Sequence, residues 1–314
     1  MTKELLLLED GDIENEAIQK YLKWGMFWVA NNNDDAAMVQ NLREFVRAIH
    51  KQQKKGYEKY TIFTTTDCNA RCYYCFERKW HPVNMTSETA YKIARFIVED
   101  YRKYNNDDKK PVRIDWFGGE PLMNTKVIDI ICDYLMKNNI LFSCNMTTNG
   151  YLFTESLAKK AKENWNLNRV QITIDGPENT YNKIKAYVNI KDNESPYQRV
   201  IANIDTLSNM GIKVKIRINL SQTNIKKQEE LAFSLADKFA GKDKIMVYGF
   251  CLFEDCAAYT HTYTEKLRAE LYKMEKNYNR LLDSLGLDSK GKTFRLRRKI
   301  KINKCFVKRF VKMI

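Results

Sequence analysis

The sequence predicts an α/β fold in which six strand–helix units form one parallel sheet. The 314 residues are 44% hydrophobic, close to the average of globular domains and sufficient for a large core. From residue 58 onward, short β-rich runs alternate with stretches of helical periodicity. Strands that alternate with helices pair in parallel, because each helix carries the chain back to the end at which the previous strand began.

Each unit has a recognisable strand and helix. The expected strands are 61–66, 112–117, 141–148, 169–174, 212–219 and 245–252. The expected helices are 86–103, 124–137, 154–163, about 197–210, 224–239 and 264–284. Thr86 and Glu88 suit the start of the first helix, and Gly211 suits the position just after the fourth. A long loop is expected between the fourth strand and the fourth helix.

Six units are too few for a complete eight-unit barrel. A partly open (β/α)6 barrel and a doubly wound sheet both fit the pattern. Either arrangement places the active site at the carboxyl ends of the strands. The residues that finish each strand are therefore the candidates for function.

The chain is expected to divide into three parts. Residues 1–57 carry helical patterns at 13–24 and 36–53 and predict a small N-terminal appendage, which is a candidate peptide-binding region. Residues 58–260 form the core of strand–helix units. Residues 261–314 hold the last helix and a basic tail.

The charge distribution excludes some classes of protein. The net charge is +14, but residues 295–314 contain nine Lys or Arg and no acid, which leaves +5 for the rest. The body is only mildly basic, so no nucleic-acid partner is expected.

No apolar run reaches the ~18–20 residues of a membrane span, and the N-terminus does not resemble a signal peptide. A cytoplasmic location follows, where the eight Cys favour metal ligands or buried thiols over disulfides.

The strongest motif is a cysteine loop directly after the first strand. Cys68, Cys72 and Cys75 form a CxxxCxxC pattern. Thiolates are soft ligands that favour zinc or an iron–sulfur cluster. A zinc site usually needs a fourth ligand, for which His81 is the nearest candidate, and no second CxxC pair exists in the chain. A cluster held by three thiolates would leave one iron open to substrate.

The next four strands also end in chemically distinctive residues. Glycines let the backbone approach a ligand closely, and an acid can pair with an ammonium group. Residues two apart on a strand share a face. The Asn-Gly and Asp-Gly pairs are also compatible with ordinary turns. In chain order the strand ends are Gly118-Gly119-Glu120-Pro121, Thr148-Asn149-Gly150, Asp175-Gly176-Pro177, and Arg217 with Asn219.

These motifs, one per unit and in this order, resemble the signatures of the radical S-adenosylmethionine (radical SAM) superfamily. The resemblance covers roughly residues 58–260. It implies a partial (β/α)6 TIM-like barrel, a [4Fe–4S] cluster on the three cysteines of the loop, and S-adenosylmethionine (SAM) as second cofactor. It also implies reductive cleavage of SAM and hydrogen abstraction from a substrate. The residues that it implies for cofactor or substrate contact are Tyr74 or Phe76, Gly118, Gly119, Glu120, Pro121, Thr148, Asn149, Asp175, Arg217 and Asn219.

The Asp175-Gly176-Pro177 run is similar to that of the peptide- and protein-modifying branch, close to the sulfatase-maturing enzymes. This implies an oxidoreductase-like maturase with a peptide or protein substrate and an electron donor such as flavodoxin or ferredoxin. Most enzymes of that branch carry a C-terminal SPASM domain rich in cysteine. Only Cys305 follows residue 284 here, so truncation of a longer gene is a hypothesis.

The other cysteines and acids are less informative. Cys132 and Cys144 are expected in the core, and Cys251 and Cys256 are interpreted as buried thiols, with ligation of an extra cluster as the alternative. Glu254 and Asp255 are the candidates for a substrate-facing acid, with a solvated loop as the alternative.

Three other functions stay open. The chain could be a radical SAM enzyme that acts on a small molecule. It could be an inactive remnant that binds a leader peptide through residues 1–57. It could also be a zinc-containing nucleic-acid protein.

Overall fold

The computed structural model describes residues 57, 59–77, 80–104, 110–190, 194–220, 224–251 and 265–287. All of them belong to one unit that spans Gly56–Ile314. Several expectations fall outside the described residues: the appendage before residue 57, the tail over 295–314, Glu254, Asp255, Cys256 and Cys305.

Six strands form one parallel sheet in the order β1-β2-β3-β4-β5-β6. Their order in space therefore equals their order along the chain, whereas a doubly wound sheet reverses its order at a switch point. The doubly wound alternative is wrong, and the partial TIM-like barrel is confirmed. The strands are β1 Lys59–Phe63, β2 Val112–Phe117, β3 Phe142–Thr148, β4 Leu167–Ile174, β5 Lys213–Leu220 and β6 Ile245–Cys251.

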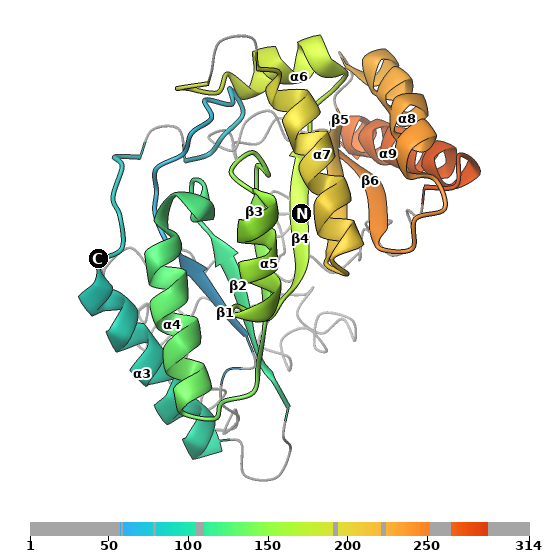
Figure 1. Cartoon of the computed structure of the whole chain (residues 1–314). Coiled ribbons are helices and arrows are strands. Elements are labelled where there is room, and N and C mark those ends of the chain that lie inside the picture. Colours follow the sequence, from blue (N-terminus) through green and yellow to red (C-terminus); the bar gives the residue numbers. More distant parts are fainter. Residues whose placement is uncertain are drawn as a thin grey trace, which may run out of the picture. The chain divides into compact units, whose positions relative to one another are not determined.

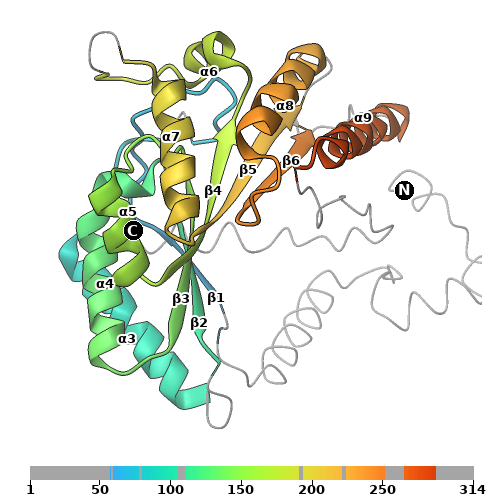
Figure 2. The same ribbon diagram turned by 45° about the vertical axis from the view of Figure 1, so that its right-hand side comes forward.

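Helices connect successive strands, and Figures 1 and 2 show α4, α5 and α7 lying over the same face of the sheet. None of the helices in the described part is long and apolar enough to cross a membrane. The helices are α3 Ser87–Tyr104, η3 Pro121–Asn124, α4 Thr125–Lys137, α5 Glu155–Glu163, α6 Glu178–Lys185, α7 Pro196–Asn209, α8 Ile225–Phe239 and α9 Glu265–Ser284.

The strands alternate between apolar and polar residues, which gives the sheet two different faces. On β4, Val170, Ile172 and Ile174 are fully buried and belong to the hydrophobic core. The residues that alternate with them, Arg169, Gln171 and Thr173, are only partly buried. Because successive side chains of a strand point to opposite faces, the core lies between sheet and helices. The opposite, concave face is polar.

Most elements lie within two residues of their expected positions, with two exceptions. The first strand ends at Phe63, so that Thr64, Thr65 and Thr66 belong to the loop that follows it. The expected long loop after β4 contains the helix α6. The residue after this helix, Ala186, has a left-handed φ of 42° where a glycine is usual, so the sequence lacks the usual signal for a helix end. Gly211, with φ 76°, follows α7 as expected.

Candidate active site

The cysteine loop leaves the carboxyl end of β1 and packs backbone to backbone against the turn after β2. The amide of Gly119 donates to the carbonyl oxygen of Thr65 (3.0 Å), and that of Glu120 donates to the carbonyl oxygen of Asp67 (2.8 Å). A Cβ atom at Gly118 or Gly119 would lie 2.2 or 2.1 Å from those same two carbonyl oxygens. Gly118 also has a φ of 134°, which favours glycine. The glycine pair is therefore needed for contact between the two loops, whereas the sequence suggested contact with a ligand.

Glu120 is completely buried and connects the second strand end with the third. Its Oε1 accepts hydrogen bonds from the hydroxyl of Thr148 (2.7 Å) and the amide of Leu122 (3.1 Å), and its Oε2 accepts one from the amide of Asn149 (2.7 Å). Burial raises the pKa of this carboxyl to about 7, although the three donors oppose the shift. The described residues supply donors to three of the roughly four acceptor sites of this carboxylate.

Asn149 joins the third strand end to the cysteine loop. Its side-chain amide donates to Oδ1 of Asn69 (2.7 Å) and, at a longer distance, to Sγ of Cys68 (3.8 Å). Its Oδ1 accepts from the amide of Tyr151 (3.0 Å), which closes a turn after β3. The TNG motif therefore positions a donor beside the first cysteine.

Asp175 lies at the end of β4 in a buried ion pair. Its Oδ2 is 2.9 Å from Nζ of Lys185 and accepts from the hydroxyl of Tyr74 (2.7 Å), while its Oδ1 accepts from Asn219 (2.7 Å). Asp175 is 2% exposed and Lys185 is 3% exposed. Nearby Asp175 keeps the pKa of Lys185 well above its usual range, although burial opposes this shift. The network ties the cysteine loop, through Tyr74, to the ends of β4 and β5.

Sequence analysis did not identify Lys185, the cation of this network. It ends α6, the helix that the pattern missed, and its carbonyl also accepts from the amide of Arg71 in the cysteine loop (2.7 Å). The only available signal was a lysine in an apparently solvated loop. Gln228 of α8 was also missed, and it donates to the carbonyl oxygens of Asp175 (2.9 Å) and Asn219 (3.1 Å).

The remaining predicted residues also lie at this end of the sheet. Arg217 donates to Oδ1 of Asn219 (3.0 Å), and its guanidinium lies 4.4 Å from the centre of the Phe250 ring. Pro121 is buried at the start of η3. Phe76 is 54% exposed and packs against Trp80 and Phe117.

The thiols of the cysteine loop are partly buried and free. Burial raises the pKa of Cys68 to about 12, with smaller contributions from the neighbouring acid and thiols, and burial also raises the pKa of Cys75. Metal binding requires the deprotonated thiolate, so a bound cation must supply the compensating charge. In the described part of the chain, no group of three His, Cys, Asp or Glu side chains could hold a single metal ion.

The cysteines outside the loop behave as predicted where they are described. Cys132 and Cys144 are fully buried in the core. Cys251 is 4% exposed, and its thiol donates to the carbonyl oxygen of Leu271 (3.2 Å). All three are therefore buried thiols.

Comparison with known proteins agrees with this geometry. The profile of the Radical SAM superfamily matches residues 62–232, which is more than half of the chain. The chain therefore belongs to the radical SAM superfamily. Membership implies a [4Fe–4S] cluster and SAM as cofactors. The three soft, partly buried thiols and the loop-to-loop cradle around Glu120 fit these groups in chemical type.

Curated relatives match the chain in part. An uncharacterised protein of Methanocaldococcus jannaschii is 29% identical over 184 residues, 57% of this chain and 56% of its own length. The radical SAM cyclopropyl synthase TigE of Paramaledivibacter caminithermalis is 28% identical over 211 residues, 60% of this chain and 43% of its own. The GTP 3′,8-cyclase of Limosilactobacillus fermentum is 29% identical over 188 residues, 59% and 52% of the two chains. The chain thus spans about half the length of the curated relatives it matches.

Solved structures share the fold. One is anSMEcpe with bound AdoMet, with a TM-score of 0.54 and 17% identity over 72% of this chain and 60% of the other. Another is Streptococcus suis SuiB bound to its precursor peptide SuiA, with a TM-score of 0.54 and 15% identity over 89% and 62% of the two chains. At such low identity, these likenesses concern the fold alone.

The packing of the glycine turn can be tested with Gly119→Ala. The added methyl group meets the Asp67 carbonyl at 2.1 Å, so the turn must shift away from the cysteine loop. We expect a loss of about 2–3 kcal/mol in the free energy of unfolding, measured with urea. Gly211→Ala is the matched control, because no atom lies within 4 Å of its Cβ position and only its left-handed φ costs about 1 kcal/mol. Equal losses in both variants would contradict this role of Gly119.

The buried ion pair predicts a strong effect of Lys185→Met. The substitution leaves Asp175 buried without its cation, which costs about 3–5 kcal/mol in unfolding free energy. The double variant Lys185→Met/Asp175→Asn removes both charges and should recover a large part of that loss. A loss below about 1 kcal/mol in the single variant, or no recovery in the double variant, would show that the pair is not coupled.

Glu120 predicts a pH dependence of stability in the cofactor-free protein. Its pKa rises from 4.5 to about 7 on folding, so between these values the folded state binds more protons than the unfolded state. The free energy of unfolding of the wild type should therefore fall, relative to that of Glu120→Gln, as the pH rises from about 4.5 to about 7. Urea unfolding of both proteins at a series of pH values measures the difference, and parallel pH profiles would exclude this role of the burial of Glu120.

Proposed function

We propose that this chain is a radical SAM enzyme that cleaves SAM reductively and abstracts a hydrogen atom from a peptide or protein substrate. The observation that carries the proposal is the position of the CxxxCxxC loop. It lies at the carboxyl end of a partial barrel, and it is hydrogen-bonded to the Gly-Gly-Glu turn and to Asn149. Such strand ends are where barrel enzymes place their chemistry.

In this proposal Cys68, Cys72 and Cys75 hold the [4Fe–4S] cluster. When bound, the cluster and SAM together supply a carbon-centred radical that removes hydrogen from an unactivated carbon, and the protein supplies position and exclusion of water. The amide of Asn149 donates toward Sγ of Cys68. A hydrogen bond to a ligating sulfur stabilises its negative charge and so tunes the potential of the cluster.

The residues around the cluster loop have separate tasks in this proposal. The turn of Gly118, Gly119 and Glu120 receives the ammonium group of SAM, while the hydrogen bonds of the Glu120 carboxylate hold the turns at Thr148 and Asn149. Arg217 and Asn219 offer a cation and an amide on β5. Asp175 and Tyr74 act as positioning residues, because both are engaged with each other and with Lys185.

A peptide or protein substrate is supported by two of the structures that share the fold. These are anSMEcpe with bound Cp18Cys peptide and SuiB with its precursor peptide SuiA. A flavodoxin or ferredoxin as electron donor and a cytoplasmic location belong to the same proposal. A small-molecule substrate is the second candidate. It is favoured by the similarity to a GTP 3′,8-cyclase and by the polar concave face of the sheet.

Anaerobic reconstitution with iron and sulfide tests the proposed activity. We expect about four iron atoms per chain from one [4Fe–4S] cluster, and dithionite-dependent formation of 5′-deoxyadenosine from SAM. Cys72→Ala should lose the cluster and all SAM cleavage, whereas Cys144→Ala, which removes a fully buried thiol of the core, should keep its iron. Zinc in place of iron, or iron retained in full by Cys72→Ala, would overturn the assignment.

A further inference from the structure

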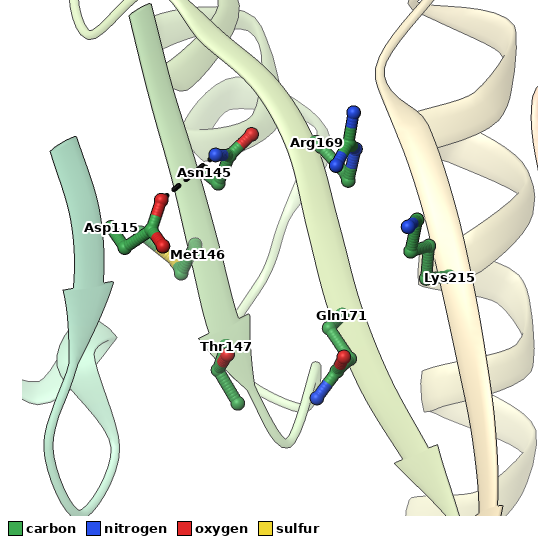
Figure 3. A pocket seen from close by; sticks show the side chains of 7 residues that line it. All are labelled: Asp115, Asn145, Met146, Thr147, Arg169, Gln171 and Lys215. Carbon is green, nitrogen blue, oxygen red and sulfur yellow. Dashed lines mark hydrogen bonds between the residues drawn. The ribbon is translucent and has the colours of Figure 1, made fainter. Parts of the chain in front are cut away.

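The concave face of the sheet contains a polar cavity apart from the candidate cofactor site. It has a volume of about 150 Å³ and is lined by side chains of four neighbouring strands. Figure 3 shows the polar side chains of this lining on the same side of the sheet. The polar residues that line it are Asp115 of β2, Asn145 and Thr147 of β3, Arg169 and Gln171 of β4, and Lys215 of β5. The inner face of a barrel is more often filled by branched apolar side chains, so this polarity requires an explanation.

Among the described residues that line this cavity, two are basic and one is acidic. Asp115, the single acid among the lining residues, is already paired with Lys59 and accepts a hydrogen bond from Asn145 (2.8 Å). No hydrogen bond or ion pair joins Asp115 to Arg169 among the described residues, so Asp115 is engaged elsewhere. Arg217 adds a third cation on the same side of β5, two residues closer to the candidate cofactor site.

Arg169 also has an unused hydrogen-bond donor. Its Nε is buried and has no partner within the described residues. Leaving a buried polar group without a hydrogen bond destabilises the fold, and more so if the group is charged. A ligand that accepts a hydrogen bond from this Nε would recover that cost.

We propose that this cavity binds an anionic group of the substrate, a carboxylate or a phosphate, with Arg169 as its principal ligand and Lys215 as a second cation. This inference rests on the proposed function, whose substrate class it narrows. The planar guanidinium matches the two oxygens of either anion, and Lys215 acts as a point charge. Gln171, held by the hydroxyl of Tyr248 (2.8 Å), completes the polar wall.

The strand register sets the distance between this anion site and the candidate cofactor site at the strand ends. Arg169 pairs with Asn145, which precedes Asn149 by four residues. Four residues of a strand span about 13 Å. A substrate anchored at Arg169 would therefore place its reacting carbon roughly 10–13 Å from its anionic group. Both a phosphorylated small molecule and a peptide with an acidic side chain meet this requirement, whereas a single small anion fills the cavity without reaching the cofactors.

Anion binding can be measured without knowledge of the substrate. The reconstituted full chain, with SAM present, is titrated by calorimetry at low ionic strength with inorganic phosphate and, separately, with succinate. Arg169→Gln and Lys215→Gln should each raise the dissociation constant about tenfold or more. Lys162→Gln, which removes the same charge from the exposed face of α5, should leave it unchanged. Arg169→Lys keeps the positive charge but loses the planar guanidinium with its paired donors. Its dissociation constant should lie between those of the wild type and Arg169→Gln.

The outcomes separate the sources of the anion. If phosphate alone binds and the charge-removing variants weaken it, the cavity is a phosphate site. If succinate alone binds in this way, it is a carboxylate site. Binding of both anions supports a site that accepts either group. Binding of neither anion, or equal dissociation constants in the wild type and the Arg169 and Lys215 variants, overturns the proposal. Circular dichroism verifies that each variant folds. If Arg169→Gln does not fold, the two single variants Lys215→Gln and Arg169→Lys provide the comparison with the wild type. SAM cleavage by the wild type is assayed separately, so failure of the proposed activity is distinguished from failure of the anion site.

Discussion

The arrangement at the carboxyl ends of the strands depends on burying one carboxylate. Glu120 has no exposed surface and binds three donors, from its own turn and from the end of β3. Each donor would be unsatisfied without it, so the turns after β2 and β3 cannot move independently. The glycine pair beside it brings the backbone of this turn against the cysteine loop, and the first three strand ends are joined in this way.

A second buried group connects the other half of the barrel to the same loop. The ion pair of Asp175 and Lys185 binds Tyr74 from the cysteine loop and Asn219 from β5. Removing two charges from water is costly, and their mutual attraction compensates only when further hydrogen bonds satisfy both groups. Here those hydrogen bonds come from the loop and from the next strand. The cysteine loop is thus held from two sides before any cofactor binds.

The two faces of the sheet divide stability from function. The helix-covered face is apolar and carries the core, with fully buried Ile172 and Trp116. The concave face keeps Arg169, Gln171 and Lys215 around a cavity. Polar side chains on this face weaken the core that a closed barrel would have, and they leave room for a ligand below the strand ends. Strand alternation by itself produces this division, because residues two apart always share a face.

The sequence by itself determined the parallel α/β architecture, most element positions and the strand-end motifs, because hydrophobic periodicity, turn residues and cysteine spacing are local properties. Only the tertiary structure decided between the open barrel and the doubly wound sheet, since strand order is a non-local property. It likewise revealed α6 with Lys185 and gave the glycine pair a partner in the cysteine loop. These features depend on contacts between residues far apart in the chain, such as Tyr74 with Asp175 and Asn149 with Asn69, and no local pattern encodes such contacts.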